Sequence, residues 1–182
     1  MSKAKLIAFY GGPGSGKSSL AYRLTGEMKA NHINCELVTE VAKDVTWDGN
    51  FDQLKNQLFI VGKQFDRIRR LENKVDYIIM DAGLLQNIPY FKDERYKKEL
   101  TQIMINIHNS YETINYFVHR STENKYDENG RKEGIDESLM IDDETLSILR
   151  NQRVRFTEIY PAAGTIFTIL SSIEQDIRNG KS

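Results

Sequence analysis

The chain has 182 residues, of which 40% are hydrophobic and 28% are charged. This composition is that of a globular protein and excludes a disordered chain. The 25 basic and 26 acidic residues give a formal net charge of −1, which excludes a global attraction to nucleic acid or anionic lipid. The single cysteine, Cys35, excludes an internal disulfide and a cysteine-based metal cage.

No apolar run approaches the roughly 20 residues that a membrane-spanning helix needs. The first apolar run, residues 6–10, is also too short for the core of a secretory signal. No linker or repeat divides the chain. We therefore expect a cytoplasmic protein without membrane contact, built as a single domain over residues 1–182.

Short apolar runs alternate with helical patterns along the chain. Runs bounded by turn or polar residues predict strands at 6–10, 35–39, 75–80, 113–118 and 165–170. Apolar residues that recur on one helical face predict helices at 17–30, 52–73, 94–111, 143–159 and from about 172 onward, with Asp52 as a cap. Strands that alternate with helices need crossover connections, so the sequence predicts an α/β fold with a parallel sheet covered on both faces.

The strongest motif is Gly11-Gly-Pro-Gly-Ser-Gly-Lys-Ser18, which fits the pattern G-x-x-x-x-G-K-[ST] of a phosphate-binding loop, or P-loop. A strand is predicted before it and a helix after it, as the motif requires. Glycines let the backbone approach a ligand closely, so successive N–H groups form an anion nest at the helix N-terminus. Lys17 adds a charge for the outer phosphates, and Ser18 offers a hydroxyl to Mg²⁺. The loop residues expected to bind ATP are Gly12, Gly14, Ser15, Gly16, Lys17, Ser18 and Ser19.

Two carboxylates directly follow predicted strands. Asp81 comes after the third strand, where the acid of a Walker B motif helps Ser18 to hold Mg²⁺. Glu40 comes after the second strand, from which a carboxylate can take the proton of an acceptor hydroxyl. Lys17, Glu40 and Asp81 are therefore the candidate catalytic residues at the edge of the sheet where the parallel strands end.

Two glutamines, Gln57 and Gln64, lie seven residues apart and therefore on one face of the helix predicted at 52–73. An amide that faces the cleft can form two hydrogen bonds with the edge of a base or a carboxamide. Gln64 is the preferred candidate for substrate binding.

A long polar stretch, residues 121–137, follows the fourth predicted strand. Kinases of this build close a mobile cationic lid over the phosphates and exclude water. We predict that 121–137 is such a lid and that Arg131 is its catalytic arginine, which stabilises the transferring phosphoryl group. Arg120 is the second arginine expected to bind the nucleotide.

Three classes of P-loop protein compete for this pattern. Asn124-Lys-Tyr-Asp127 spells the N-K-x-D motif of guanine-nucleotide binders, but residues 120–123 separate it from the end of its strand. A mechanical ATPase of the AAA type needs a helical lid domain, for which we expect no room in 182 residues. A small phosphotransferase fits best, and a nucleotide-dependent switch without an acceptor is the alternative from another class.

Together these residues resemble the AAA_28-type family of P-loop kinases, which includes bacterial nicotinamide riboside kinases and has deoxynucleoside kinases as more distant relatives. The shared residues are the loop 11–18, Glu40 with Ala42 and Lys43, Gln64, and Asp81. The resemblance implies an ATP- and Mg²⁺-dependent kinase with the three-layer P-loop NTPase fold, whose five-stranded parallel sheet has the order 2-3-1-4-5. It also implies that Glu40 is the base and that Lys43 and Gln64 join it around the substrate.

The resemblance leaves the acceptor open. Deoxynucleoside kinases carry Glu-Arg-Ser where this chain has Asp81-Ala-Gly83, so an ordinary deoxynucleoside is not implied. We expect a small nucleoside- or nucleotide-like acceptor. The alternative acceptor is 5-hydroxymethyluracil within DNA. Residues 126–131 resemble lids of bacteriophage members of the family, and some of those members resemble kinases that phosphorylate this base in the polymer. A phage-encoded member would act in the host cytoplasm. A DNA acceptor requires a basic surface, and a homodimer is also open because related kinases are often dimers. The candidate basic residues are Lys63, Arg67, Arg69, Arg70 and Lys74.

Overall fold

Five short segments form one parallel sheet in residues 4–120 and 134–179, the part of the chain that the computed structural model describes. The strands are β1 (Lys5–Tyr10), β2 (Cys35–Val38), β3 (Tyr77–Met80), β4 (Thr113–Val118) and β5 (Thr157–Ile159). They lie in the order β2-β3-β1-β4-β5, and each neighbouring pair is parallel. The predicted fold class and strand order are therefore confirmed.

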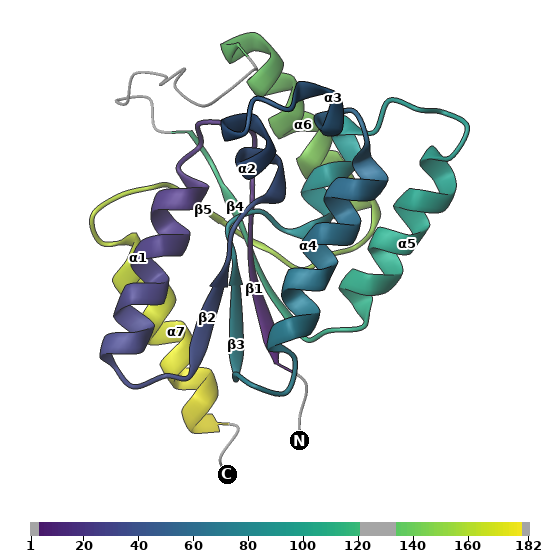
Figure 1. The fold of residues 1–182 in the computed structure, drawn as a ribbon. Coiled ribbons are helices and arrows are strands. Elements are labelled where there is room, and N and C mark those ends of the chain that lie inside the picture. Colours follow the sequence, from purple (N-terminus) through teal and green to yellow (C-terminus); the bar gives the residue numbers. More distant parts are fainter. Residues whose placement is uncertain (1–3, 121–133, 180–182) are drawn as a thin grey trace.

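Helices occupy the connections between the strands. They are α1 (Lys17–Ala30), α2 (Val41–Trp47), α3 (Phe51–Leu54), α4 (Gln57–Leu71), the 3-10 helix η1 (Leu84–Tyr90), α5 (Lys97–Asn109), α6 (Ile135–Asn151) and α7 (Thr165–Asn179). α1 and α7 pack on one face of the sheet, whereas α4, α5, α6 and η1 pack on the other (Figure 1). The result is the three-layer arrangement expected for alternating strands and helices.

The pleat of β1 sends successive side chains into two separate cores. Leu6, Ala8 and Tyr10 belong to the core with α4, α5 and α6, whereas Ile7 and Phe9 belong to the core with α1 and α7. All five are at most 2% exposed. A shift of one residue would exchange the two sets, so packing on both faces specifies the register of β1 against its neighbours. This register also determines where the loop after β1 begins.

The strand predicted at 165–170 is wrong, because these residues begin helix α7. A short apolar run does not by itself distinguish a strand from a buried turn of helix. Its apolar residues continue at helical spacing past the run and pack on the same core as α1. They are Ile166, Ile169, Leu170 and Ile173. The fifth strand is instead β5, which pairs with β4 through Phe117 and Glu158.

The helix predicted at 52–73 is two helices, α3 and α4. Asn56 caps α4 by accepting a hydrogen bond from the Phe59 N–H at 3.1 Å. Asp52 does not act as that cap and pairs with Lys55 at 2.8 Å.

Two further differences concern helices near the strand ends. The helix predicted at 143–159 is α6, which begins at Ile135 and ends at Asn151. The last three residues of the predicted lid at 121–137 are therefore helical, while residues 121–133 lie outside the described part of the chain. Helices α2 and η1 were not predicted.

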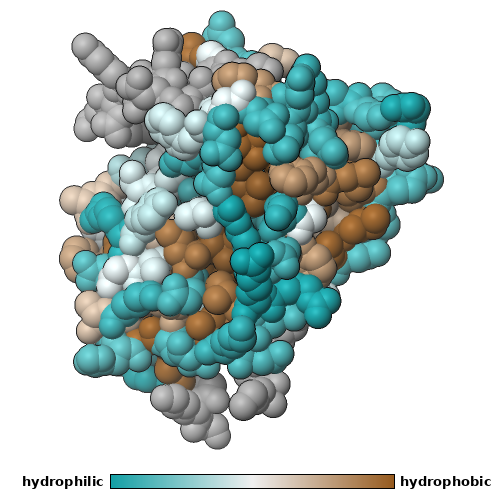
Figure 2. All heavy atoms as spheres, in the orientation of Figure 1, coloured by the Kyte–Doolittle hydropathy of each residue, from teal (hydrophilic) through white to brown (hydrophobic). Residues whose placement is uncertain are grey.

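Hydrophilic residues cover most of the face seen in Figure 2, and apolar side chains gather both between α1 and β2 and over α4 and α5. Leu58 and Ile103 are among the exposed apolar residues of these two helices. Within residues 4–120 and 134–179, no helix combines the length and the apolar character that crossing a membrane demands.

Gly83→Ala is expected to lower the free energy of unfolding by about 1–3 kcal/mol, the usual cost of overpacking a core. An added Cβ would lie 2.2 Å from Cζ of the buried Tyr10 ring. Gly62→Ala, in α4, is the matched control, because nothing lies within 4 Å of its added Cβ and alanine favours a helix. Urea denaturation of both variants measures the difference. An unchanged midpoint for Gly83→Ala would contradict this close contact.

Candidate nucleotide-binding site

The loop between β1 and α1 has the backbone conformation that an anion nest needs. Gly14 and Gly16 have φ values of 82° and 101°, in the left-handed region that favours glycine. Helix α1 begins at Lys17, directly after Gly16, so the unpaired N–H groups of its first turn face the loop. The predicted nucleotide-binding residues Gly12, Gly14, Ser15, Gly16, Lys17, Ser18 and Ser19 all lie in this loop or in the first turn of α1.

The Lys17 side chain is buried against the loop, with only 8% of the residue exposed. Its Nζ donates hydrogen bonds to the backbone oxygens of the first two loop residues, Gly11 and Gly12, the second at 2.9 Å. Burial lowers the pKa of the Lys17 ammonium, whereas the charges of Glu40 and Asp81, among others, raise it. Carboxylates from separate elements therefore lie within electrostatic reach of one buried cation.

Asp81 follows β3 directly and is 1% exposed. Both of its carboxylate oxygens are buried, and neither has a hydrogen-bond partner in the described part of the chain. Mg²⁺ takes oxygen ligands and is usually held by one or two carboxylates, phosphates and water. Asp81 and the half-buried Ser18 hydroxyl of α1 therefore fit the predicted Mg²⁺ site. No group of three or more His, Cys, Asp or Glu side chains with metal-binding geometry occurs in the described residues, so a metal here would depend on phosphate oxygens.

Glu40 is the N-cap residue of α2 and lies half-buried at the carboxyl end of β2. The start of α2 is held by α4, because Gln64 Oε1 accepts a hydrogen bond from the Val41 N–H at 3.1 Å. The Gln64 Nε2 is buried and has no hydrogen-bond partner among the described residues. Lys43 lies half-buried in the first turn of α2. The structure thus brings the predicted substrate residues to the same edge as Lys17.

Gln86 of η1 is a residue of this site that sequence reasoning missed. Its Oε1 accepts a hydrogen bond from the Gly11 N–H at 2.9 Å, and its Nε2 donates to Thr145 Oγ1 of α6 at 3.2 Å. Gln86 is 3% exposed, and Thr145 is fully buried. Its place between apolar residues, in Leu-Leu-Gln-Asn-Ile at 84–88, was a weak sequence signal that it shares with Asn87.

Arg120, which follows β4, lies against the P-loop. It donates hydrogen bonds to the Pro13 backbone oxygen at 2.6 Å and to the Asp142 carboxylate at 2.7 Å. Asp142 also accepts a hydrogen bond from the Gly12 N–H and was not singled out by any motif. Arg131 and the segment 124–127 lie outside the described residues.

Aromatic residues flank the loop on the side of β4 and β5. His119 and Tyr160 stack with ring centroids 4.8 Å apart, and Tyr160 is 63% exposed. The next residue, Pro161, lies beside the P-loop, because a Cβ added to Gly16 would be 3.3 Å from it. The exposed Tyr160 therefore offers an aromatic surface on which a planar group can stack, next to the end of the P-loop.

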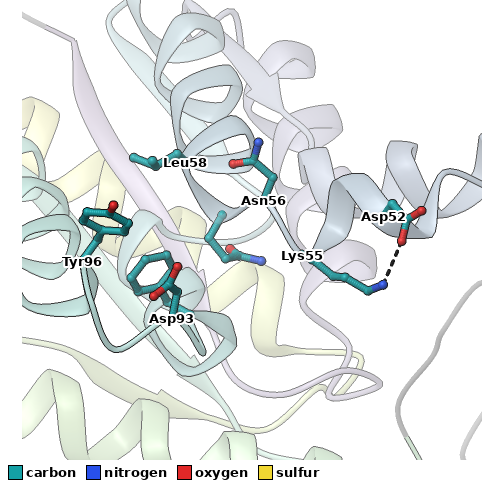
Figure 3. Close-up of a pocket in the computed structure, with 8 residues that line it drawn as sticks. Asp52, Lys55, Asn56, Leu58, Asp93 and Tyr96 are labelled. Carbon is teal, nitrogen blue, oxygen red and sulfur yellow. Dashed lines mark hydrogen bonds and ion pairs between the residues drawn. The ribbon is translucent and has the colours of Figure 1, made fainter.

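A cavity of about 320 Å³, open to solvent, lies where α3 and α4 meet the loop before α5 (Figure 3). Both apolar and polar side chains line it, among them Leu58, Tyr96, Asn56 and Asp93, which Figure 3 labels. Gln57 also lines the cavity and is 6% exposed. Its Oε1 is buried and has no hydrogen-bond partner in the described residues, whereas its Nε2 donates to the Leu54 backbone oxygen at 2.9 Å.

The fold is similar to that of deoxyadenosine kinase from M. mycoides. The structure with bound dATP gives a TM-score of 0.56 at 15% identity, over 95% of this chain and 99% of that one. The structure with dCMP and dCDP gives 0.55 at 12% identity, over 96% and 99%. An APS kinase from Mycobacterium tuberculosis in complex with AMPPNP and APS gives only 0.46 at 11% identity, over 96% and 98%. No curated protein matches this sequence.

The sheet order, the loop and these similarities define a P-loop kinase-like fold. The AAA_28 family, described as an AAA domain, matches residues 6–165 and so covers most of the chain. The protein therefore belongs to the AAA_28 family.

Gln86→Leu is expected to lower the free energy of unfolding by about 1–3 kcal/mol, the cost of leaving a buried polar group unpaired. The change removes the acceptor of the Gly11 N–H and the donor to Thr145 while preserving the approximate volume of the side chain. Gln102→Leu, on the exposed face of α5, is the control. Thermal and urea unfolding measure both, and equal stability of the two variants would show that Gln86 does not support the loop.

Proposed function

We propose that this protein is a kinase that transfers the γ-phosphoryl group of ATP to a hydroxyl or phosphate of a nucleoside- or nucleotide-like acceptor. The observation that carries the proposal is the buried Lys17 ammonium of the P-loop, with Glu40 and Asp81 in its electrostatic reach. In-line phosphoryl transfer needs a cation for the phosphates, an acid for the metal and a base for the acceptor. The similarity in fold to deoxyadenosine kinases supports the same class of reaction.

The donor nucleotide is assigned to the P-loop and to the side of β4 and β5. Its phosphates lie in the nest at the start of α1, where Lys17 can exchange its two backbone acceptors for phosphate oxygens. Ser18 and Asp81 would hold Mg²⁺, which would supply positive charge to these phosphates when bound. The exposed ring of Tyr160, stacked on His119 beside the loop, supports a place for the adenine.

The acceptor is assigned to the side of α2 and α4. Gln57 and Gln64 lie seven residues apart on α4, a rise of about 10 Å at 1.5 Å per residue. Gln64 holds the start of α2 beside Glu40, and Gln57 lines the cavity. The reacting group therefore lies near Glu40, while the ring system of the acceptor extends into the cavity. The Gln57 side chain lines this cavity, and its amide can hydrogen-bond the edge of the ring.

In the transfer to a hydroxyl, the acceptor oxygen forms a bond to the γ-phosphorus as the bond between that phosphorus and the β–γ bridging oxygen breaks. The bridging oxygen keeps the electron pair and leaves as part of ADP. Glu40 takes the hydroxyl proton and later releases it to solvent. The buried Lys17 ammonium compensates the charge that gathers on the bridging and γ-phosphoryl oxygens. We propose Arg131 as a further cation from the segment 121–137.

Lys17→Ala is expected to reduce phosphoryl transfer at least a hundredfold, roughly the loss seen when one preorganised charge-stabilising donor is removed. The assay follows label from ATP labelled in the γ-phosphate into nucleosides, nucleotides and DNA that contains 5-hydroxymethyluracil. Lys29→Ala is the control on the same helix, because Lys29 is exposed and pairs with Glu36 on the surface.

Three results of this assay separate the alternatives. Full activity of Lys17→Ala would overturn the assignment of the P-loop as the donor site. Label in the DNA, without label in free nucleosides, would establish the polymer as the acceptor. Slow ATP hydrolysis with no labelled product from a broad set of acceptors would favour a nucleotide-dependent switch.

Gln57→Leu is expected to raise the KM for the acceptor roughly five- to tenfold, because one hydrogen bond contributes about 1 kcal/mol net. The KM for ATP stays unchanged, since Gln57 lies on the acceptor side of the site. Gln53→Leu is the control, because it makes the same change at an exposed position of α3. Steady-state kinetics with the acceptor found above measures both constants. A shift in the KM for ATP alone would contradict the assignment of this cavity to the acceptor.

A further inference from the structure

The carboxylate of Asp142, on α6, joins two parts of the donor site. Its Oδ1 accepts a hydrogen bond from the Gly12 N–H of the P-loop, and its Oδ2 accepts one from Arg120 Nε at 2.7 Å. The side chains of Asp142 and Arg120 are only 14% and 16% exposed, so solvent screens this ion pair much less than a surface pair.

The guanidinium of Arg120 also donates hydrogen bonds to two backbone oxygens of the described residues beside the loop. Nη1 donates to the Pro13 backbone oxygen at 2.6 Å, and Nη2 donates to the Ser138 backbone oxygen at 3.1 Å. A guanidinium stays charged at all accessible pH values and has a planar set of donors, so these acceptors determine its position and its orientation. The Pro13 and Ser138 acceptors are neutral backbone oxygens, whereas the Asp142 carboxylate carries a full negative charge.

The contact between α6 and the loop leaves no space at Gly12. A Cβ added there would lie 2.4 Å from the Ser138 oxygen, 2.7 Å from Arg120 Nη2 and 2.9 Å from Asp142 Oδ1. The P-loop, Arg120 and α6 are therefore tightly packed against one another. Both Asp142 and Arg120 also act electrostatically on Lys17, the first raising and the second lowering its pKa.

We propose that Asp142 is a positioning residue of the donor site, whose charge holds Arg120 against the P-loop and whose Oδ1 fixes the Gly12 peptide. Arg120 is then a preplaced cation at the edge of the nest, and the amides from Gly14 onward stay directed at the phosphates. This inference rests on the proposed donor site, but it requires no particular acceptor.

Asp142→Asn is the decisive variant, because it preserves the shape and the oxygen that the Gly12 N–H can use but removes the charge that faces Arg120. The expected result is a roughly tenfold weaker binding of ADP in calorimetry, the scale of one charge-assisted hydrogen bond. The KM for ATP rises by a similar factor, the KM for the acceptor does not change, and Asp142→Glu recovers part of the loss. Asp143→Asn, the adjacent exposed acid on α6, is the control and binds ADP as the unchanged protein does.

A double-mutant cycle separates positioning from a merely structural role. Arg120→Met combined with Asp142→Asn is expected to weaken ADP binding no more than Arg120→Met alone, because Asp142 acts through Arg120. Unchanged ADP affinity of a folded Asp142→Asn, or additive losses in the cycle, would overturn the inference. Because ADP binding needs no acceptor, failure to find any phosphoryl transfer would instead count against the proposed function.

Discussion

The buried ammonium of Lys17 is the interaction on which the rest of the site depends. A cation this enclosed loses its solvation by water, and groups of the protein must replace it. Two backbone oxygens of the loop supply hydrogen bonds, and carboxylates from the ends of β2 and β3 and from α6 supply negative charge. These groups can meet only because parallel strands end at the same edge of the sheet. The buried charge of Lys17 therefore requires that β2, β3 and α6 bring carboxylates close to the P-loop.

Features with a local cause could be predicted from the sequence. Glycine placement determines the loop and the start of α1, and the common edge of parallel strands brings Glu40 and Asp81 near Lys17. The fifth strand could not be predicted in the same way. β5 has three residues, two of them exposed, so no hydrophobic pattern marks it, and its conformation follows from pairing with β4. The apolar run at 165–170 carried the stronger strand signal but belongs to a helix whose periodicity extends past it.

Contacts between residues far apart in the sequence were beyond sequence reasoning, even where the residue itself was a candidate, as Gln64 was. Gln64 reaches 23 positions back to Val41, Gln86 reaches 75 positions back to Gly11, and Asp142 reaches 130 positions back to Gly12. An amide both accepts and donates, which explains why a glutamine can stand between a loop N–H and a helix hydroxyl. The local sequence does not distinguish such residues from other polar positions, because their partners exist only in the folded chain.

These contacts divide the P-loop into two functional parts. The N–H groups of Gly11 and Gly12 are bound by Gln86 and Asp142, so the position of the loop is maintained by η1 and α6 rather than by phosphate. The part from Gly14 onward leads into the N-terminus of α1, where an anion finds unpaired N–H groups. A loop that is already fixed loses little conformational freedom when its ligand binds. Dipoles held in place before the reaction are also what stabilises charge in a transition state, so the same anchoring serves both binding and catalysis.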